Sequence, residues 1–201
     1  MGLREIKMER TRHLIADTAL ELFSLHGFDH TTIEQIAAAA EVGPRTLYRY
    51  FPTKESLIVG FVEVHLAAAV EQLKVQPADT PLPEALYALV DSVIATITAN
   101  SDRIMTVYAI GDCTPSVRAQ FGELWRAWQG EVATEITRRY HGKSADLVGQ
   151  MGAVLCMLAI DTSVRAWTES GGKANMRRLL NRALEMLRTG EIPIATPPTR
   201  A

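Results

Sequence analysis

The sequence between Thr32 and Leu57, TIEQIAAAAEVGPRTLYRYFPTKESL, contains closely spaced signals for helix starts and stops. Thr32 is a good N-cap, and Gln35 lies three residues on, at the spacing of a capping box. After one apolar helical stripe, Glu41-Val42-Gly43 interrupts the pattern. Pro44 then suits the first position of a new helix, because its missing N–H would have no partner there. The segment predicts two short helices joined by a tight turn and followed by the start of a third.

The second of these helices, Pro44 to Tyr50, is only about two turns long and is rich in hydrogen-bond donors and aromatic rings. Leu47 and Phe51 can hold it against a partner helix. A short polar helix held in this way suits insertion into the major groove of DNA, so the segment is typical of a helix-turn-helix. The alternative is a pair of ordinary bundle helices with solvated Arg and Tyr. Agreement among the capping box, Pro44 and the second cap at Pro52-Thr53 favours DNA binding.

The stretch from His26 to Ile58, HGFDHTTIEQIAAAAEVGPRTLYRYFPTKESLI, resembles the tetracycline-repressor (TetR) family of bacterial transcription regulators. The resemblance covers about the first 60 residues. It implies a DNA-binding head of three helices and a C-terminal helical domain for ligand sensing and dimerisation. The sequence departs from the family at Glu41, where the turn often carries Gly, and at Gly43, where the recognition helix is often capped by Ser.

Several residues in this stretch are candidates for DNA contact. Arg45 lies at the exposed start of the recognition helix, and Arg is well suited to bidentate contact with guanine. The family resemblance implies that other residues position the DNA backbone, namely Thr32, Tyr48, Tyr50 and Lys54. The full candidate set is Thr32, Pro44, Arg45, Thr46, Tyr48, Arg49, Tyr50 and Lys54.

Average charge does not itself favour DNA binding. The chain has a formal net charge of −2, and residues 1–55 hold seven Lys and Arg against eight Asp and Glu. Placement matters more, because phosphate contacts act within about a Debye length, ~8 Å at physiological salt. Arg45, Arg49 and Lys54 gather in the reading head, so local charge can support binding where the average does not.

Few helix breakers and no long strand-like alternation predict an all-α fold. We expect a helix-turn-helix DNA-binding domain at residues 1–52, a helical effector-binding and dimerisation domain at 53–190, and a Pro-rich disordered tail at 191–201. The first helix should run from Glu5 to His26, with Leu14, Leu20 and Phe23 in its buried stripe. A long helix from Thr53 to the residues before Pro77 should belong to both domains. The remaining helices are expected at Glu84–Thr98, Asp102–Asp112, Ser116–Tyr140, Ala145–Ser170 and Lys173–Thr189.

The last two helices are apolar on more than one face. On the first of them, Leu147, Met151 and Leu158 mark one side, while Ile160 and Trp167 mark another. A helix that is apolar all round must be buried all round. One face can cover its own domain and the other a partner subunit, which predicts a homodimer with a four-helix interface. The alternative is one thick monomeric core.

Aromatic and Met side chains concentrate in the C-terminal domain, where they can form plain core or line a ligand pocket. The family resemblance favours a pocket for the group, with Asp161 among the polar residues that could orient a ligand. Asp161 and Arg165 could equally form an ordinary helix ion pair. The candidate pocket set is Met105, Tyr108, Trp125, Trp128, Met157 and Asp161. Few of these residues carry charge, so we expect an apolar or mostly apolar effector.

Other chemistry has little support in the sequence. There is no nucleophile motif, phosphate-binding loop or pair of carboxylates at catalytic spacing, so we expect no enzyme activity and no cofactor. His26 and His30 straddle a turn and do not share a helix face, so no metal site is expected. Cys113 and Cys156 lack metal or disulfide spacing, which fits a reducing compartment. The longest apolar run, Met151 to Ile160, is too short for a bilayer, and we expect a cytoplasmic protein without a membrane partner.

The sequence therefore predicts a dimeric DNA-binding transcriptional regulator. Its partners would be a palindromic operator in double-stranded DNA and a small apolar effector that releases a repressor from that operator. The alternative is an architectural or assembly DNA-binding protein without an effector. A third hypothesis, an enzyme with an accessory helix-turn-helix, finds no support in the motifs.

Overall fold

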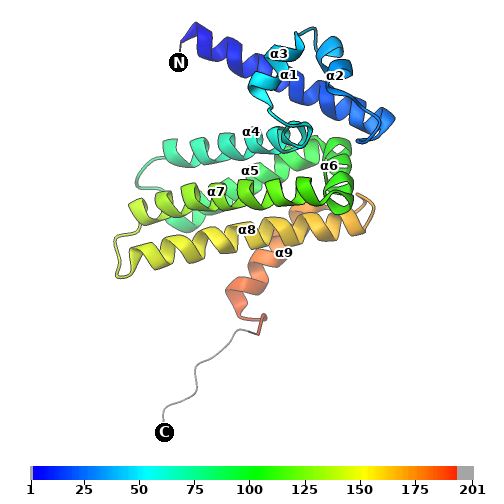
Figure 1. The fold of residues 1–201 in the computed structure, drawn as a ribbon. Coiled ribbons are helices and arrows are strands. Elements are labelled where there is room, and N and C mark those ends of the chain that lie inside the picture. Colours follow the sequence, from blue (N-terminus) through cyan, green and yellow to red (C-terminus); the bar gives the residue numbers. More distant parts are fainter. Residues whose placement is uncertain (1, 194–201) are drawn as a thin grey trace.

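The computed structural model describes residues 2–193, and within them the chain forms nine α-helices and no strand (Figure 1). The all-α fold predicted from the sequence is thus confirmed for this part of the chain. Residues 194–201 of the predicted tail lie outside the described residues. The helices are α1 (Leu3–His26), α2 (Ile33–Ala39), α3 (Pro44–Tyr50), α4 (Lys54–Val75), α5 (Leu82–Ala99), α6 (Ser101–Cys113), α7 (Pro115–Arg139), α8 (Ala145–Glu169) and α9 (Met176–Thr189).

Helices α1 to α3 form a small head above the remaining bundle (Figure 1). Helix α1 stops where Gly27 adopts a left-handed backbone with φ of 83°, a conformation that glycine adopts without steric cost. Helix α2 starts with the predicted capping box. The backbone N–H of Gln35 donates to Oγ1 of Thr32 at 3.2 Å, and the N–H of Thr32 donates to Oε1 of Gln35 at 2.8 Å.

The turn between α2 and α3 is a Schellman motif. The N–H of Glu41 donates to the carbonyl of Ala38 at 3.1 Å, and the N–H of Val42 donates to the carbonyl of Ala37 at 2.9 Å. Glu41 has a φ of 53°, in the left-handed region where a non-glycine residue costs about 1 kcal/mol. The departure from the family pattern at this position is therefore a local strain within an otherwise regular turn.

The core of the head comes from all three of its helices. Leu20 on α1, Ile36 on α2 and Leu47 on α3 are at most 1% exposed, as is Phe51 directly after α3. One expectation for α1 was wrong: Leu14 is 51% exposed, and Ile15 is fully buried in its place. At about 100° per residue, Ile15 shares a helix face with the buried residues that follow it, and Leu14 is turned away from that face.

Helix α4 connects the head to the bundle. Thr53 caps it as predicted, and its Oγ1 accepts the backbone N–H of Ser56 at 3.1 Å in a second capping box. The helix packs against α1 in the head and against α5 and α7 in the bundle. It is therefore a structural part of both.

Three helices, α4, α5 and α8, are long and apolar enough by length and composition alone to cross a membrane. In the folded chain all three pack against other helices: α4 against α5 and α7, α5 also against α8 and α9, and α8 against α7. Part of their apolar surface is therefore buried in the core of the bundle.

Helices α7 and α8 approach closely at Gly149. A methyl group at this position would meet the side chain of Thr137 and would lie 2.6 Å from the carbonyl oxygen of Ala133. The approach of these two helices therefore requires glycine.

We predict that Gly149→Ala lowers the free energy of unfolding by about 1–3 kcal/mol through overpacking. Gly130→Ala is the matched control, because a methyl group there would meet nothing within 4 Å. It should raise stability by up to ~1 kcal/mol through helix propensity. Chemical denaturation of both variants measures the difference, and equal stability of the two would contradict the predicted close packing.

Candidate functional site

The recognition helix α3 presents a polar face to solvent and buries an apolar one. Arg45, Tyr48 and Arg49 are exposed, while Leu47 is fully buried. Of the other candidates on this helix, Pro44 is exposed, and Thr46 and Tyr50 are half-buried. The fold thus leaves the outward donors of a short helix free to meet another surface, which is the arrangement that major-groove reading needs.

The two candidate residues outside α3 flank it. Thr32 is exposed and caps α2 through its oxygen, so its hydroxyl proton remains available to a phosphate. Lys54, in the first turn of α4, places Nζ 4.4 Å from the ring centroid of Phe28 and 5.9 Å from that of Phe23. This cation–π contact holds the ammonium group beside the reading head. DNA contact by these residues remains a prediction.

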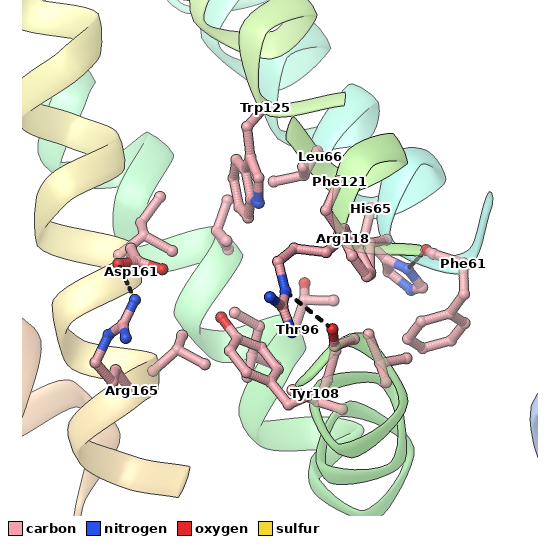
Figure 2. Close-up of a pocket in the computed structure, with 18 of the residues that line it drawn as sticks. Phe61, His65, Leu66, Thr96, Tyr108, Arg118, Phe121, Trp125, Asp161 and Arg165 are labelled. Atoms are coloured by element: carbon pink, nitrogen blue, oxygen red, sulfur yellow. Dashed lines mark hydrogen bonds and ion pairs between the residues drawn. The ribbon is translucent and has the colours of Figure 1, made fainter. Parts of the chain in front are cut away.

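The bundle contains a cavity of about 500 Å³ between α4, α5, α6, α7 and α8 (Figure 2). Most of its wall is apolar or aromatic. The lining residues are Phe61, Val62, His65, Leu66, Val93, Thr96, Ile97, Ile104, Val107, Tyr108, Gly111, Asp112, Arg118, Phe121, Trp125, Ile160, Asp161, Val164 and Arg165.

Polar groups occupy a few defined places on this wall. On α8, Arg165 donates to Asp161 at 3.3 Å, so this pair forms the helix ion pair considered from the sequence. Burial raises the pKa of the nearby Tyr108 hydroxyl above its usual range, and the Asp161 charge adds to the shift. Tyr108 therefore stays neutral and can donate or accept a hydrogen bond. On α4, Nδ1 of His65 donates to the carbonyl of Phe61 at 2.7 Å.

Half of the predicted pocket residues lie on the cavity wall. Tyr108, Trp125 and Asp161 line it, whereas Met105, Trp128 and Met157 do not. Trp128 is only 3% exposed and packs edge-to-face against Trp125, with ring centroids 5.9 Å apart. It therefore belongs to the core that holds Trp125 in the cavity wall.

Sequence reasoning missed the contribution of α4 and the start of α7. Phe61, His65 and Arg118 line the cavity, yet none of them belongs to the predicted set. The apolar period of α4 marked which residues are buried. That period does not distinguish the α4 residues that line a cavity from those that pack in a solid core.

The cavity and the head share helix α4. A methyl group at Gly60 would lie 3.2 Å from Cζ of Phe51, so Phe51, at the end of the recognition helix, rests directly on the α4 backbone. The next two residues, Phe61 and Val62, line the cavity. One turn of α4 therefore contacts the recognition helix on one side and the cavity on another.

Polar contacts also join the head to the bundle. Arg103 on α6 pairs with Asp17 at 2.8 Å and with Glu21 at 3.2 Å, both on α1. Arg12 on α1 pairs with Glu63 on α4. At the start of α7, Ser116 donates to Glu55 at 3.1 Å and Gln120 donates to Thr53 at 3.3 Å, so α7 is bonded to the start of α4, where the chain leaves the head.

Helix α8 carries an apolar stripe that faces away from its own bundle. Its residues recur at helical spacing and remain open to solvent in the single chain. They are Leu147, Met151, Val154, Leu155 and Leu158, with exposed fractions between 38% and 60%. A stripe of this length on one helix is unusual for a surface that stays in water.

The described part of the chain holds no cluster of metal-ligating side chains, and its two cysteines differ in exposure. Within residues 2–193, no three His, Cys, Asp or Glu side chains gather to hold a metal ion. Cys113 is exposed and Cys156 is buried. Burial raises the pKa of the Cys156 thiol to about 11, so this thiol is protonated at neutral pH.

Two family models match the chain. The model of bacterial regulatory proteins of the tetR family matches residues 15–60, and that of the MftR C-terminal domain matches residues 108–191. The first match contains the complete helix-turn-helix. The second begins on α6 at the cavity and ends after α9.

Curated relatives agree with this assignment. The chain is 31% identical over 144 residues to the HTH-type transcriptional regulator TcmR of Streptomyces glaucescens. That match covers 69% of this chain and 64% of TcmR, so the chain spans just under two thirds of that relative. It is also 30% identical over 140 residues to MftR of Mycobacterium tuberculosis, assigned to the regulation of mycofactocin biosynthesis, and covers 71% of it.

Solved structures share the fold. FadR of Thermus thermophilus, a TetR-family transcriptional repressor solved in complex with lauroyl-CoA, superposes with a TM-score of 0.64 at 23% identity, covering 94% of this chain and all of that one. FadR of Bacillus halodurans has the same TM-score at 20% identity, covering 90% of this chain and 95% of that one. From its family matches and relatives, the chain belongs to the tetR family of bacterial regulatory proteins, which are DNA-binding transcriptional regulators and not enzymes.

Proposed function

We propose that this regulator is a homodimeric repressor, released from a palindromic operator by a small, mostly apolar effector. In this proposal residues 1–52 form the DNA-binding domain and residues 53–190 the effector-binding and dimerisation domain. The observation that carries the proposal is the shared turn of α4, where Gly60 supports the recognition helix and Phe61 lines the cavity.

The exposed face of α3 supports DNA reading by the head. Arg45 and Thr46 lie in its first turn, where residues of a recognition helix reach base edges. Thr32, Tyr48 and Lys54 surround that turn with groups that can contact phosphates.

The apolar stripe on α8 supports dimerisation through α8 and α9. Met151, in the second turn of α8 and within the stripe, is 54% exposed in the single chain, and Leu184 on α9 is half-buried. A partner subunit would remove both from water, and a two-fold dimer would present two recognition helices to two half-sites. The alternative of one thick monomeric core leaves this stripe in water and is the weaker account.

The cavity supports binding of a small effector. Its volume of about 500 Å³ falls in the range of about 300–1,000 Å³ typical of ligand sites. The mostly apolar wall favours an apolar molecule with limited polar character. The lauroyl-CoA complex of FadR from Thermus thermophilus indicates that the same fold can receive an acyl ligand.

Release of DNA requires the effector to bind the DNA-incompetent conformation more tightly than the DNA-competent one. A coupling free energy of about 1–3 kcal/mol is ordinary for such regulators. Two parts of the structure connect the cavity to the head and could transmit this coupling. One is the shared turn of α4, and the other is α6, which contributes Tyr108 to the cavity and Arg103 to the ion pairs with α1.

The alternative of an architectural DNA-binding protein without an effector assigns no role to the cavity. It predicts no response of DNA affinity to any cavity ligand. An inverted repeat upstream of its own gene or a divergent neighbour would favour the regulator over this alternative.

We predict that Arg45→Ala weakens binding to a duplex selected by the wild-type protein from random sequences by about 1–3 kcal/mol, and relaxes base preference at one position per half-site. The exposed Arg126 on α7 provides the control, since Arg126→Ala removes the same charge outside the head. Footprinting and titration measure both effects. Wild-type affinity and selectivity in Arg45→Ala would remove Arg45 from the reading surface.

We predict that Met151→Glu yields a folded monomer that no longer binds its operator, because a charge would be buried at the centre of the proposed interface. Val75→Glu serves as the control, since Val75 is 79% exposed and lies at the end of α4, outside the stripe. This control should remain dimeric in sedimentation at micromolar concentration. A wild-type protein that sediments as a folded monomer would contradict the dimer.

A further inference from the structure

Arg118, in the first turn of α7, is exposed and brings a positive charge to the open side of the cavity. Figure 2 places its guanidinium between Trp125, Thr96 and Tyr108, inside the ring of lining residues. Nε donates to the carbonyl of Gly111 at 3.3 Å, and one terminal nitrogen, Nη2, donates to the carbonyl of Asp112. Both acceptors are neutral backbone groups at the end of α6.

The guanidinium retains hydrogen-bonding capacity beyond these two contacts. Arginine has five N–H donors in a planar fork, and the contacts to Gly111 and Asp112 engage only two of its three nitrogens. Within residues 2–193, Arg118 forms no ion pair, whereas the other cationic group on the wall, Arg165, is paired with Asp161. Arg118 is therefore the cavity cation whose charge is least compensated by its own contacts.

We propose that the effector carries an oxyanion head group, a carboxylate or a phosphate, and that Arg118 receives it while an apolar body fills the remainder of the cavity. This inference rests on the proposed function of the cavity. The planar fork of a guanidinium matches two oxygens of either head group. Phe61, Phe121 and Ile160 provide apolar surface for the body of the ligand.

Binding of an oxyanion would also change how α6 is held. An oxyanion attracts a guanidinium more strongly than a neutral carbonyl does, because both partners carry charge, so the head group would compete with the carbonyls of Gly111 and Asp112. Those carbonyls belong to the last turn of α6, whose other end carries Arg103 and its ion pairs to the head. The residue that recognises the effector would thus loosen one end of a helix that contacts the DNA-binding head.

The charge of the remaining wall makes the sign of the head group testable. Asp112 and Asp161 are both on the wall, and an ammonium head group would select them instead of Arg118. Four amphiphiles with the same alkyl chain separate these cases: decanoate, decyl phosphate, 1-decanol and decylammonium. Each is titrated into the full-length protein below its micellar concentration, by calorimetry or by tryptophan fluorescence.

We expect wild-type protein to bind decanoate or decyl phosphate at least about tenfold more tightly than 1-decanol, because only the two anions can form a charge-assisted contact with Arg118. The tighter of the two anions identifies the head group. Arg118→Gln should abolish this preference and leave 1-decanol binding unchanged, which also shows that the variant is folded. Arg118→Lys should keep part of the preference, and Arg126→Gln should keep all of it.

Equal wild-type affinity for the anions and 1-decanol, or an anion preference that survives Arg118→Gln, would overturn this inference and leave the proposed apolar effector intact. Tightest binding of decylammonium would overturn the inference and indicate that Asp112 and Asp161 bind a cationic head group instead. Failure of all four amphiphiles to bind wild-type protein would contradict the proposed function of the cavity itself, and the inference with it.

Discussion

The contact between Phe51 and the backbone of α4 at Gly60 is the interaction on which the arrangement of this protein depends. Phe51 ends the recognition helix and is 1% exposed, and Arg12 from α1 lies over its ring at 5.7 Å. Because Gly60 has no side chain, the ring packs directly on the helix. Phe61, the next residue, lines the cavity. A displacement of this turn of α4 would therefore also displace Phe51 and the recognition helix.

Helix α6 provides a second connection with a different character. On the side that faces the cavity, Val107 is buried and burial keeps Tyr108 neutral. On the side that faces the head, Arg103 forms partly exposed ion pairs with Asp17 and Glu21. Partly exposed ion pairs of this kind are worth little, about 0–1 kcal/mol each. They can set the orientation of the head without preventing its movement, while the packed contact at Phe51 supplies the stability.

The head was predictable from sequence because its signals are local. The capping box at Thr32, the helix start at Pro44 and the stop at Gly27 each act within a few residues, and the structure confirms all three. The cavity was only partly predictable. Trp125 lines it and Trp128, one turn away, does not, since the choice depends on where α4 and α8 lie. Arg118 was missed for the same reason: nothing near it in sequence indicates that this exposed side chain lines the cavity.

The central claim, that the cavity and the DNA-binding head are energetically coupled, is tested most directly by thermodynamic linkage. The measurement is the affinity of the tightest-binding amphiphile for free protein and for protein saturated with its selected operator. Coupling predicts that operator-bound protein binds the amphiphile about 5–150-fold more weakly, and that the amphiphile weakens operator binding by the same factor. Equal amphiphile affinity in the free and operator-bound protein would contradict the account.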